Sequence, residues 1–258
     1  LDSGVVQIEA SRKQSFFIKD DSSLWAMGNN EMGQLGDGTT ADRLSPVKIV
    51  DENVTSVKTG YQHTLFLKKD GSLWAMGNNQ SGQFGDGTTT NRLSPVKIID
   101  ENVTAIGAGW AHSAFLKNDG SLWGMGNNWA GQLGDGTNSS HLTPVKVEDE
   151  NVTAIATRLD HTLFLKNDGS LWGMGNNHLG ALGAGNHRNT KQSPVKIADG
   201  NVTAIGAGEL YSLFVKDDGS LWGMGYDSAG QLGTGRSLWR TSPHRITDPD
   251  PQGDQITF

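Results

Sequence analysis

The sequence predicts an all-β protein, specifically a five-bladed β-propeller of four-stranded antiparallel blades. The first observation is a repeat, since the stretch NDGSLWGMGNNWAGQLGDGT at residues 118–137 has four near-copies elsewhere in the 258-residue chain. Its tryptophans recur every 49 or 50 residues, a period typical of arrays and propellers. They are Trp25, Trp74, Trp123, Trp172 and Trp222. The second observation is that short alternating runs are frequent, whereas no segment has the 3.6-residue period of a helix.

Each unit contains four candidate strands, and the third unit illustrates them. Val103–Ala108 is a strand of small and apolar residues, and His112–Lys117 follows it with alternating polarity. The turn at 118–120 tolerates positive φ and leads into Leu122–Gly126, which carries the large ring. Pro144–Val147 is the fourth strand, and its proline predicts a sheet edge, where a missing N–H does no harm.

The repeat also predicts the domain organisation, a single propeller over residues 1–258. The units span approximately 5–52, 53–101, 102–150, 151–200 and 201–247, with a tail at 248–258. We expect the small-residue strand of each unit to line the axis and the proline strand to be outermost. Residues 255–258 either add a strand that fastens the ring or form a disordered end. The competing fold, a solenoid of stacked hairpins, would need polar caps that the terminal units do not show.

Composition and charge narrow the function. The net charge of −7 argues against a nucleic-acid binder or an anionic-membrane binder, both of which need a basic surface. No apolar run approaches the roughly 20 residues that cross a bilayer, and no signal peptide is visible. The absence of cysteine fits a reducing compartment and an exported bacterial protein equally, so the location stays open, with slight preference for the exported one. We expect a monomer.

The repeat resembles that of the regulator of chromosome condensation family. The resemblance rests on HSAFLK at 112–117, DGSLWGMGNNWAGQLGDG at 119–136 and a later Pro-Val, and it covers residues 5 to about 246. It implies a propeller, commonly of seven blades in that family, against five here. Nothing in the sequence singles out the nucleotide-exchange site of the founding member. A relative of the same propeller class is similar to a secreted bacterial β-lactamase inhibitory protein, which binds another protein with one face. The resemblance thus implies fold more strongly than function.

The repeats differ from one another mainly in two connections, the first-to-second and the third-to-fourth. In an antiparallel meander these connections emerge on the same face. The turns of the opposite face hardly vary. Relaxed drift of exposed loops is the alternative explanation, but drift should scatter over both faces and should not favour large rings. We therefore predict that the variable residues bind a partner. They are Arg12, Lys13, Glu31, Tyr61, Gln62, Gln80, Trp110, Trp129, Arg158, Leu159, Asp160, His178, Glu209, Leu210, Tyr226 and Trp239.

These residues predict a non-catalytic binding module that recognises a macromolecule, specifically a protein. Exposed Trp and Tyr are typical anchors of protein interfaces, and Tyr61, Trp110 and Trp129 would form the centre. Charged residues would surround it and set orientation, namely Arg12, Lys13, Glu31, Arg158, Asp160 and Glu209. One alternative is a multivalent carbohydrate-binding lectin, although equivalent sugar pockets demand equivalent residues. The other is a structural scaffold without a ligand of its own.

Catalytic, metal and cofactor sites are not expected. The inner strands offer one acidic residue, Glu9, and no Ser lies in a G-x-S-x-G elbow. The histidines of one column lie in different blades, so we expect each to bond a neighbouring loop rather than a shared metal. The Asp-Gly-Thr aspartates lack the oxygen pattern of a calcium loop and should stabilise turns. The histidines are His63, His112 and His161, and the aspartates are Asp37, Asp86 and Asp135.

Two asparagine patterns are attributed to turn chemistry. The Gly-Asn-Asn sequences are expected to use the tolerance of Asn for left-handed backbone. Four Asn-Val-Thr sequons recur at the same turn between units, which indicates a structural reason rather than glycosylation. They begin at Asn53, Asn102, Asn151 and Asn201.

Overall fold

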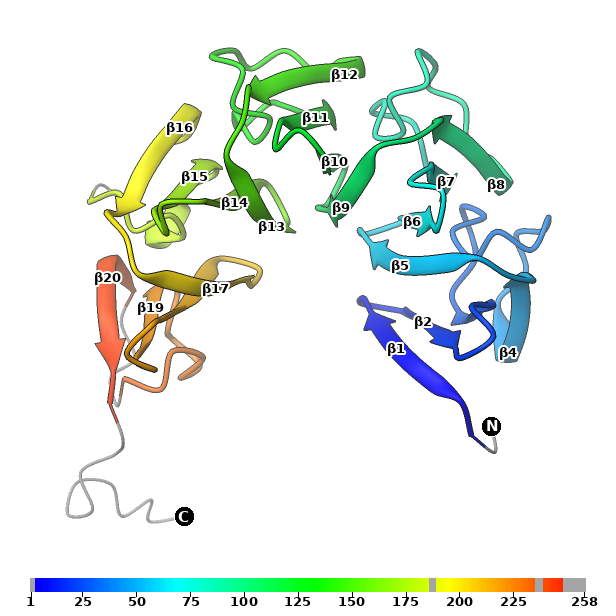
Figure 1. The fold of residues 1–258 in the computed structure, drawn as a ribbon, viewed down its shortest axis with the longest axis horizontal. Helices are drawn as coiled ribbons and strands as arrows, with labels where there is room; N and C mark the ends of the chain where they lie inside the picture. Colours follow the sequence, from blue (N-terminus) through cyan, green and yellow to red (C-terminus); the bar gives the residue numbers. More distant parts are fainter. Residues whose placement is uncertain (1–2, 186–188, 235–238, 248–258) are drawn as a thin grey trace.

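Five four-stranded sheets make up the fold (Figure 1). The computed structural model describes residues 3–185, 189–234 and 239–247, and within these ranges all regular structure is β except one short 3-10 turn, η1 (His178–Gly180). Every sheet is an antiparallel meander whose strands pair in chain order. The predicted all-β, five-bladed propeller is therefore confirmed. The tail at 248–258, including the suggested closing strand at 255–258, lies outside the described residues.

The strand bounds follow the repeat. Blade 1 contains β1 (Val5–Ala10), β2 (Gln14–Lys19), β3 (Leu24–Gly28) and β4 (Arg43–Val50). Blade 2 contains β5 (Val54–Thr59), β6 (His63–Lys68), β7 (Leu73–Gly77) and β8 (Arg92–Ile99). Blade 3 contains β9 (Val103–Ala108), β10 (His112–Lys117), β11 (Leu122–Gly126) and β12 (His141–Glu148). Blade 4 contains β13 (Val152–Arg158), β14 (His161–Lys166), β15 (Leu171–Gly175) and β16 (Lys191–Ala198). Blade 5 contains β17 (Val202–Ala207), β18 (Tyr211–Lys216), β19 (Leu221–Gly225) and β20 (Arg240–Ile246).

The outermost strands are longer than the sequence indicated. β12 begins at His141 and not at Pro144, because His141 already pairs with Gly126 across a register shift in β11. β20 likewise begins at Arg240, three residues before its proline. The proline sits on the free side of the last strand, where its missing N–H removes no ladder bond. Its expected edge position is correct, and only the start of the strand was wrong.

The constant D-x-S-L-W letters build the hairpin between the second and third strands. In blade 3, Asp119 Oδ1 accepts hydrogen bonds from the backbone N–H and the hydroxyl of Ser121, at 2.9 and 2.6 Å. The hydroxyl of Ser121 in turn accepts the indole N–H of Trp123 at 2.8 Å. Lys117 and Lys146 lie over the Trp123 ring, with their Nζ atoms 5.0 and 5.4 Å from its centroid. These letters therefore hold the blade together.

The core lies between blades. Phe16, Leu24 and Leu35 of blade 1 pack against Val57 and Phe66 of blade 2, and all five side chains are almost fully buried. Equivalent clusters lie between each later pair of neighbouring blades. A backbone hydrogen bond crosses each of these boundaries, as from Val54 N to Ser22 O at 3.0 Å. Each blade is thus stabilised by its neighbours, as expected for a repeat array.

The blades form an arc with the inner strands β1, β5, β9, β13 and β17 toward its centre (Figure 1). Blades 1 and 5 stand at the two sides of an opening in the arc. Ile8 of blade 1 is 76% exposed, whereas Val57 at the same position of blade 2 is fully buried. Among the described residues, no helix has the length and apolar character needed to cross a membrane.

Candidate ligand-binding face

The two variable connections of each blade lie side by side. A backbone hydrogen bond joins them in every blade, for example from Asn127 N to Ala111 O at 2.9 Å and from Asn176 N to Asp160 O at 2.7 Å. The other three bonds run from Asn29 to Lys13, from Asn78 to Gln62 and from Tyr226 to Leu210. The loop positions that differ between repeats are consequently arranged around one face of the arc, as the meander predicted.

Buried carboxamides support the longer of these loops. Asn128 is fully buried, donates to Asp135 Oδ1 at 2.9 Å and to Thr137 O at 3.1 Å, and accepts from Leu133 N at 2.9 Å. The expectation that the Gly-Asn-Asn asparagines adopt left-handed backbone is wrong, because the positive φ of this segment belongs to the preceding glycine, Gly126. The asparagine is needed for its side chain, which ties the two ends of the loop together.

The Asp-Gly-Thr aspartates stabilise the same loops. Asp135 accepts the backbone N–H and the hydroxyl of Thr137, at 3.0 and 2.9 Å, and lies 2.6 Å from His141 Nε2. Burial by itself raises the pKa of Asp135, but the hydrogen bonds from Thr137, Asn128 and His141 outweigh it and leave the pKa below its usual range. The carboxylate contacts are turn contacts, and no group of three possible metal ligands occurs within the described residues.

Buried histidines link neighbouring blades beneath the face. His63 Nε2 lies 3.0 Å from Ser113 Oγ, and His112 Nε2 lies 3.1 Å from Thr162 Oγ1. The Ser113 hydroxyl donates to the carbonyl of Gln83 at 2.7 Å. The same hydroxyl therefore accepts from His63, whose neutral ring carries its hydrogen on Nε2. The expected partner, a neighbouring loop, is therefore corrected to a strand hydroxyl of the next blade. Burial lowers the pKa of His63 to about 4, and together with the nearby histidines it lowers the pKa of His112 to about 3.

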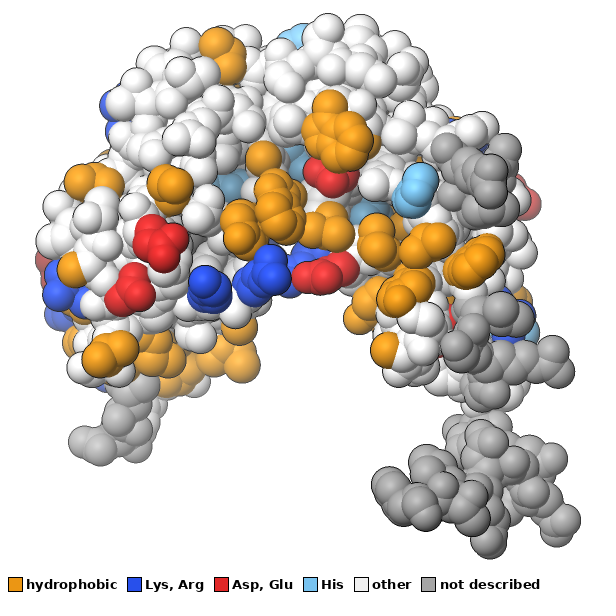
Figure 2. Space-filling view, turned by 180° about the vertical axis from the view of Figure 1, so that it is seen from behind, with side chains coloured by type: hydrophobic (Ala, Val, Ile, Leu, Met, Phe, Trp, Pro, Cys, Tyr) orange, Lys and Arg blue, Asp and Glu red, His pale blue; other side chains and the backbone are white. Residues whose placement is uncertain are grey.

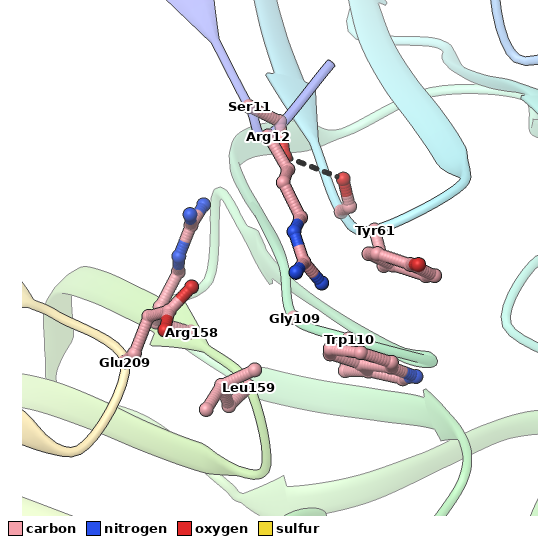
Figure 3. Close-up of a pocket in the computed structure, with 9 residues that line it drawn as sticks. Ser11, Arg12, Tyr61, Gly109, Trp110, Arg158, Leu159 and Glu209 are labelled. Carbon is pink, nitrogen blue, oxygen red and sulfur yellow. Dashed lines mark hydrogen bonds between the residues drawn. The ribbon is translucent and has the colours of Figure 1, made fainter. Parts of the chain in front are cut away.

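A shallow hollow opens on the face where the first connections of all five blades meet (Figure 3). It brings together six of the sequence-predicted residues: Arg12, Tyr61, Trp110, Arg158, Leu159 and Glu209. Its volume is about 20 Å³, room for one or two water molecules. The hollow therefore has room for only part of a side chain.

Two aromatic rings from neighbouring blades form one wall of the hollow. Tyr61 and Trp110 stack with centroids 4.0 Å apart and planes inclined by 8°. Trp110 remains 41% exposed in spite of this stack. The guanidinium of Arg12 lies 5.8 Å from the centroid of the Tyr61 ring, within cation–π range. An apolar plate with a cation at its margin is the main chemical feature of the face.

Small residues that the comparison of repeats passed over hold this wall in place. Ser11 Oγ donates to Gly60 O at 2.9 Å, the bond drawn in Figure 3. Trp110 N donates to Leu159 O at 2.8 Å, so the connections of successive blades are tied to one another. A Cβ on Gly109 would lie too close to Cε1 of the His112 ring for any larger residue to fit here without a shift. Their column holds a small residue in four of the five repeats, Ser11, Gly60, Gly109 and Gly208, with Arg158 in the fourth repeat, and this preference directly beside more variable positions is the signal in the sequence.

The charges of the hollow are mixed. Arg158 and Glu209 lie opposite the aromatic wall, beyond Leu159 (Figure 3). Within the part of the chain that the structure describes, neither Arg12 nor Arg158 forms an ion pair. Leu159 has a φ of 41°, a left-handed conformation that is uncommon for a branched side chain. Because Arg12 and Arg158 form no ion pair with a described residue, their guanidinium groups are available to a carboxylate of a ligand.

A second cluster lies beside the hollow. Trp129 is 58% exposed and its side chain hydrogen-bonds to Asp160, which also accepts from Gln132 Nε2 at 3.3 Å. Burial raises the pKa of Asp160, and the bond from Trp129 opposes that rise. Figure 2 shows hydrophobic side chains gathered along the inner margin of the arc, next to Lys/Arg and Asp/Glu side chains.

The other predicted residues do not line the hollow. Lys13, Glu31, Gln80 and His178 are exposed on the loops of blades 1, 2 and 4, and Gln62 and Leu210 are half-buried. Tyr226 is half-buried on blade 5, and Trp239, just before β20, is 47% exposed. The structure thus separates the predicted set into a central group and a wider ring.

Comparisons agree with this geometry. Five four-stranded meanders arranged around an axis define the chain as a β-propeller. A family model described as an RCC1-like domain matches residues 1–257, and the chain belongs to this RCC1-like domain family. No curated protein sequence matches it.

Solved structures superpose closely on the chain. Human WBSCR16 matches with a TM-score of 0.83 and 26% identity, covering 95% of this chain and 67% of that one. Prp20p of Saccharomyces cerevisiae, described with its binding properties to Gsp1p and histones, matches with a TM-score of 0.82 and 23% identity over 95% and 63%. Yeast RCC1 (Prp20) in a structure with Kap60 bound to it matches with 0.81 and 23% over 95% and 61%. The chain spans about two thirds of the length of these proteins.

Proposed function

We propose that this chain is a protein-binding module that recognises its partner through the loop face, with the Tyr61–Trp110 stack at the centre of contact. The observation that carries the proposal is the stack itself, built by two blades from positions at which the repeats differ. Large rings held rigid and partly exposed supply much contact area at low entropic cost. The mechanism is occupancy, without covalent chemistry.

The relatives support protein recognition in general. Prp20p is described with Gsp1p, histones and Kap60 as partners. Because this chain spans 61–63% of the Prp20p chains, we bring over the class of ligand and no particular activity or partner.

The chemistry of the face favours a partner segment with two features. An aromatic or aliphatic side chain would lie against the exposed face of Trp110. A neighbouring carboxylate would be directed toward Arg12 and Arg158, because charge-assisted hydrogen bonds to a guanidinium are strong and directional. Glu209 and Asp160 would repel a uniformly acidic partner, so the mixed charges select orientation and not just charge.

The shape of the face disfavours the lectin alternative. A multivalent lectin repeats one sugar pocket in each blade, which requires the same residues at the same positions. The column at the hollow instead holds Arg12, Tyr61, Trp110, Leu159 and Glu209, five residues of different chemistry. One asymmetric surface fits one asymmetric partner better than five copies of a sugar.

The test compares three forms of the full chain as bait. One is unchanged, one carries Tyr61→Ser with Trp110→Ala, and a matched control carries Glu52→Ser with Glu101→Ser on the opposite-face turns. A protein captured by the unchanged chain is purified and its Kd is measured for all three. We expect the aromatic double variant to weaken binding by about 100-fold, close to 3 kcal/mol, and the control to stay within about twofold.

Two results would contradict the proposal. Equal Kd values for the aromatic variant and the unchanged chain would remove the stack from the interface. Release of every captured protein by one simple sugar would establish the lectin alternative instead. Circular dichroism of the three forms checks that the exposed substitutions leave the blades folded.

A further inference from the structure

A lysine lies over the ring of every tryptophan that the repeat keeps constant. The distance is 4.7 Å both from Lys68 Nζ to the Trp74 centroid and from Lys216 Nζ to the Trp222 centroid. The same contact occurs at Trp25, Trp123 and Trp172. The negative face of an indole attracts a cation, so this fold uses a cation–π contact in each blade.

In three blades an aspartate completes the contact. Lys146 Nζ lies 5.4 Å from the centroid of the Trp123 ring and 3.4 Å from Asp149 Oδ1. The other two sets are Trp25, Lys48 and Asp51, and Trp172, Lys196 and Asp199. We call this combination of an indole ring, a cation over it and a carboxylate that pairs with the cation a Trp–cation–Asp triad.

Trp129 and Asp160 are two members of such a triad on the loop face. The indole N–H of Trp129 donates to Asp160, and the Trp129 side chain is 58% exposed. Among the residues that the structure describes, no Lys or Arg lies over this ring, no other ring stacks on it, and no cation pairs with Asp160. The chain thus supplies the ring and the carboxylate, and the described residues supply no cation.

The carboxylate of Asp160 has few donors for its burial. It is half-buried and accepts the indole N–H of Trp129 and the amide of Gln132, the latter at 3.3 Å. A carboxylate has about four acceptor positions, so it can accept further donors. Burial raises the pKa of Asp160 although the bond from Trp129 opposes the rise. A cation of a ligand would compensate the desolvated charge.

A purely structural role for Asp160 is the competing explanation. The loop, however, closes without it: Gln132 Nε2 already donates to Asn127 Oδ1 at 2.8 Å. In blade 1 the equivalent Gln34 donates to Asn29 at 2.7 Å with no aspartate beside it. A neutral amide in place of Asp160 would also accept the indole N–H without the cost of desolvating a charge. The negative charge is therefore not required by the loop.

The ring and the carboxylate lie next to the hollow. Asp160 directly follows Arg158 and Leu159, which line it. The loop that carries Trp129 is joined to the first connection of its own blade by the bond from Asn127 N to Ala111 O at 2.9 Å. A ligand segment that enters the hollow is consequently within reach of Trp129.

We propose that Trp129 and Asp160 form a subsite for a positively charged side chain, lysine or arginine, of the protein ligand. The side chain lies over the Trp129 ring and pairs with the Asp160 carboxylate, as Lys146 does with Trp123 and Asp149. The proposal deepens the proposed function and rests on it for its biological ligand. With a carboxylate directed toward the arginines of the hollow, the ligand segment carries both signs of charge.

The subsite can be measured without any partner protein. Nα-acetyl-lysine methylamide and Nα-acetyl-arginine methylamide are titrated at pH 7.5 into the full chain labelled with nitrogen-15, and Nα-acetyl-norleucine methylamide is the uncharged probe. The indole N–H resonance of Trp129, identified by its loss in Trp129→Phe, reports binding. The Trp123 resonance is the internal control, because Lys117 and Lys146 already cover that ring.

We expect both cationic probes to shift the Trp129 resonance with millimolar Kd values, and the norleucine probe to bind at least about 10-fold more weakly. The tighter of the two cationic probes identifies the preferred side chain. Asp160→Asn keeps an acceptor for the indole N–H and should weaken both cationic probes by about fivefold. Glu101→Gln, on an exposed turn of the opposite face, should leave their Kd values within about twofold.

A second variant keeps the test decisive if Asp160→Asn does not fold. Trp129→Leu leaves the carboxylate in place and should weaken the lysine probe by about threefold, measured at the side-chain amide resonance of Gln132. Circular dichroism of each variant shows whether the blades are folded.

Three results would overturn the proposal. They are no shift at Trp129 up to about 50 mM of either cationic probe, equal Kd values for the lysine and norleucine probes, and unchanged cation binding in the folded variants of the subsite. None of them involves a captured protein, so they leave the Tyr61–Trp110 proposal standing. A failed capture experiment, in turn, does not alter the probe affinities.

Discussion

At the scale of single residues, the buried histidines act as hydrogen-bond links that work only when neutral. His63, His112 and His161 each place Nε2 near a hydroxyl of the next blade, at 3.0 to 3.2 Å. The folded-state pKa of His161 is lowered to about 4 by burial, as for His63. An unfolded histidine takes up its proton at about pH 6.5. The links therefore stabilise the array above that pH and penalise it below.

The difference between the folded and the unfolded histidine pKa predicts that the protein loses stability at a pH well above the range in which carboxylates titrate. The contribution of the histidines to the free energy of unfolding should be full above about pH 6.5. It should fall as the pH drops toward the folded pKa values, by about 2 kcal/mol for each histidine at pH 5. His112→Gln should remove about one third of the fall, because Gln cannot take up a proton. Gln14 is a natural model, since it reaches Gly60 O and Tyr61 O of the next blade at 3.3 and 3.2 Å.

Denaturant unfolding at pH 7.5 and pH 5.0 measures both effects. A fall in the free energy of unfolding that is the same size in His112→Gln as in the unchanged chain would show that other groups titrate. The Asp-Gly-Thr aspartates contribute in a lower window, because their folded pKa values are lowered and their stabilisation is lost only as the pH falls through those values.

At the scale of the elements, the longest loop of blades 1, 2, 3 and 5 is organised by one buried side chain and its partner. In blades 1 to 3 the pair is Asn with Asp, as in Asn128 with Asp135. In blade 5 the pair is Asp227 with Thr234, whose hydroxyl donates to the carboxylate. Both pairs also give an acceptor to the same backbone N–H, as from Leu232 N to Asp227 Oδ1 at 2.8 Å. The two pairs therefore make equivalent hydrogen bonds in the same loop with the polar groups exchanged.

Exchange between these pairs gives a double-mutant test. Asn128→Asp keeps the acceptor for Leu133 N but sets a second carboxylate against Asp135, so we expect a loss of about 2–3 kcal/mol. Asp135→Thr in the same chain recreates the blade 5 pair and should recover at least half of that loss. Denaturant unfolding of the two single variants and the double variant measures the coupling. Purely additive losses would contradict the pairing.

The turns between blades explain a recurring sequon. Asn53, Asn102, Asn151 and Asn201 all have φ between 65° and 70°, a left-handed conformation that Asn tolerates better than other non-glycine residues. Asn102 Oδ1 also accepts a hydrogen bond from Asn118 Nδ2 at 2.9 Å. The asparagine of each Asn-Val-Thr is therefore required by the turn.

At the scale of the whole molecule, much of the fold could be predicted because five copies of the repeat have the same pattern of strands and turns. The first three strands of the third unit were predicted to the residue, since Asn118–Gly120 and the Gly109-Trp110 step mark their ends. The start of the outer strand was missed because the residues before the proline lack an alternating pattern. The opening of the arc was not predictable, since a repeat count does not fix the angle between neighbouring blades.

The site was predictable in outline only. Variation between repeats identified Tyr61 and Trp110, but their stacking depends on how two blades meet, which no single repeat encodes. Ser11, Gly60 and Gly109 were missed because small residues beside a turn look structural, although they position the stack. A comparison of repeats thus finds which positions vary on the loop face, and the inter-blade geometry decides which of them lie together.

The central claim is that the loop face binds a protein, and hydrogen exchange of the full chain with and without its captured partner tests it most directly. We predict that the partner slows exchange at the first connections of the blades, residues 11–13, 60–62, 109–111 and 158–160. Exchange at the opposite-face turns, 51–53, 100–102 and 149–151, should not change. Protection of those turns, with no change at the first connections, would contradict the account.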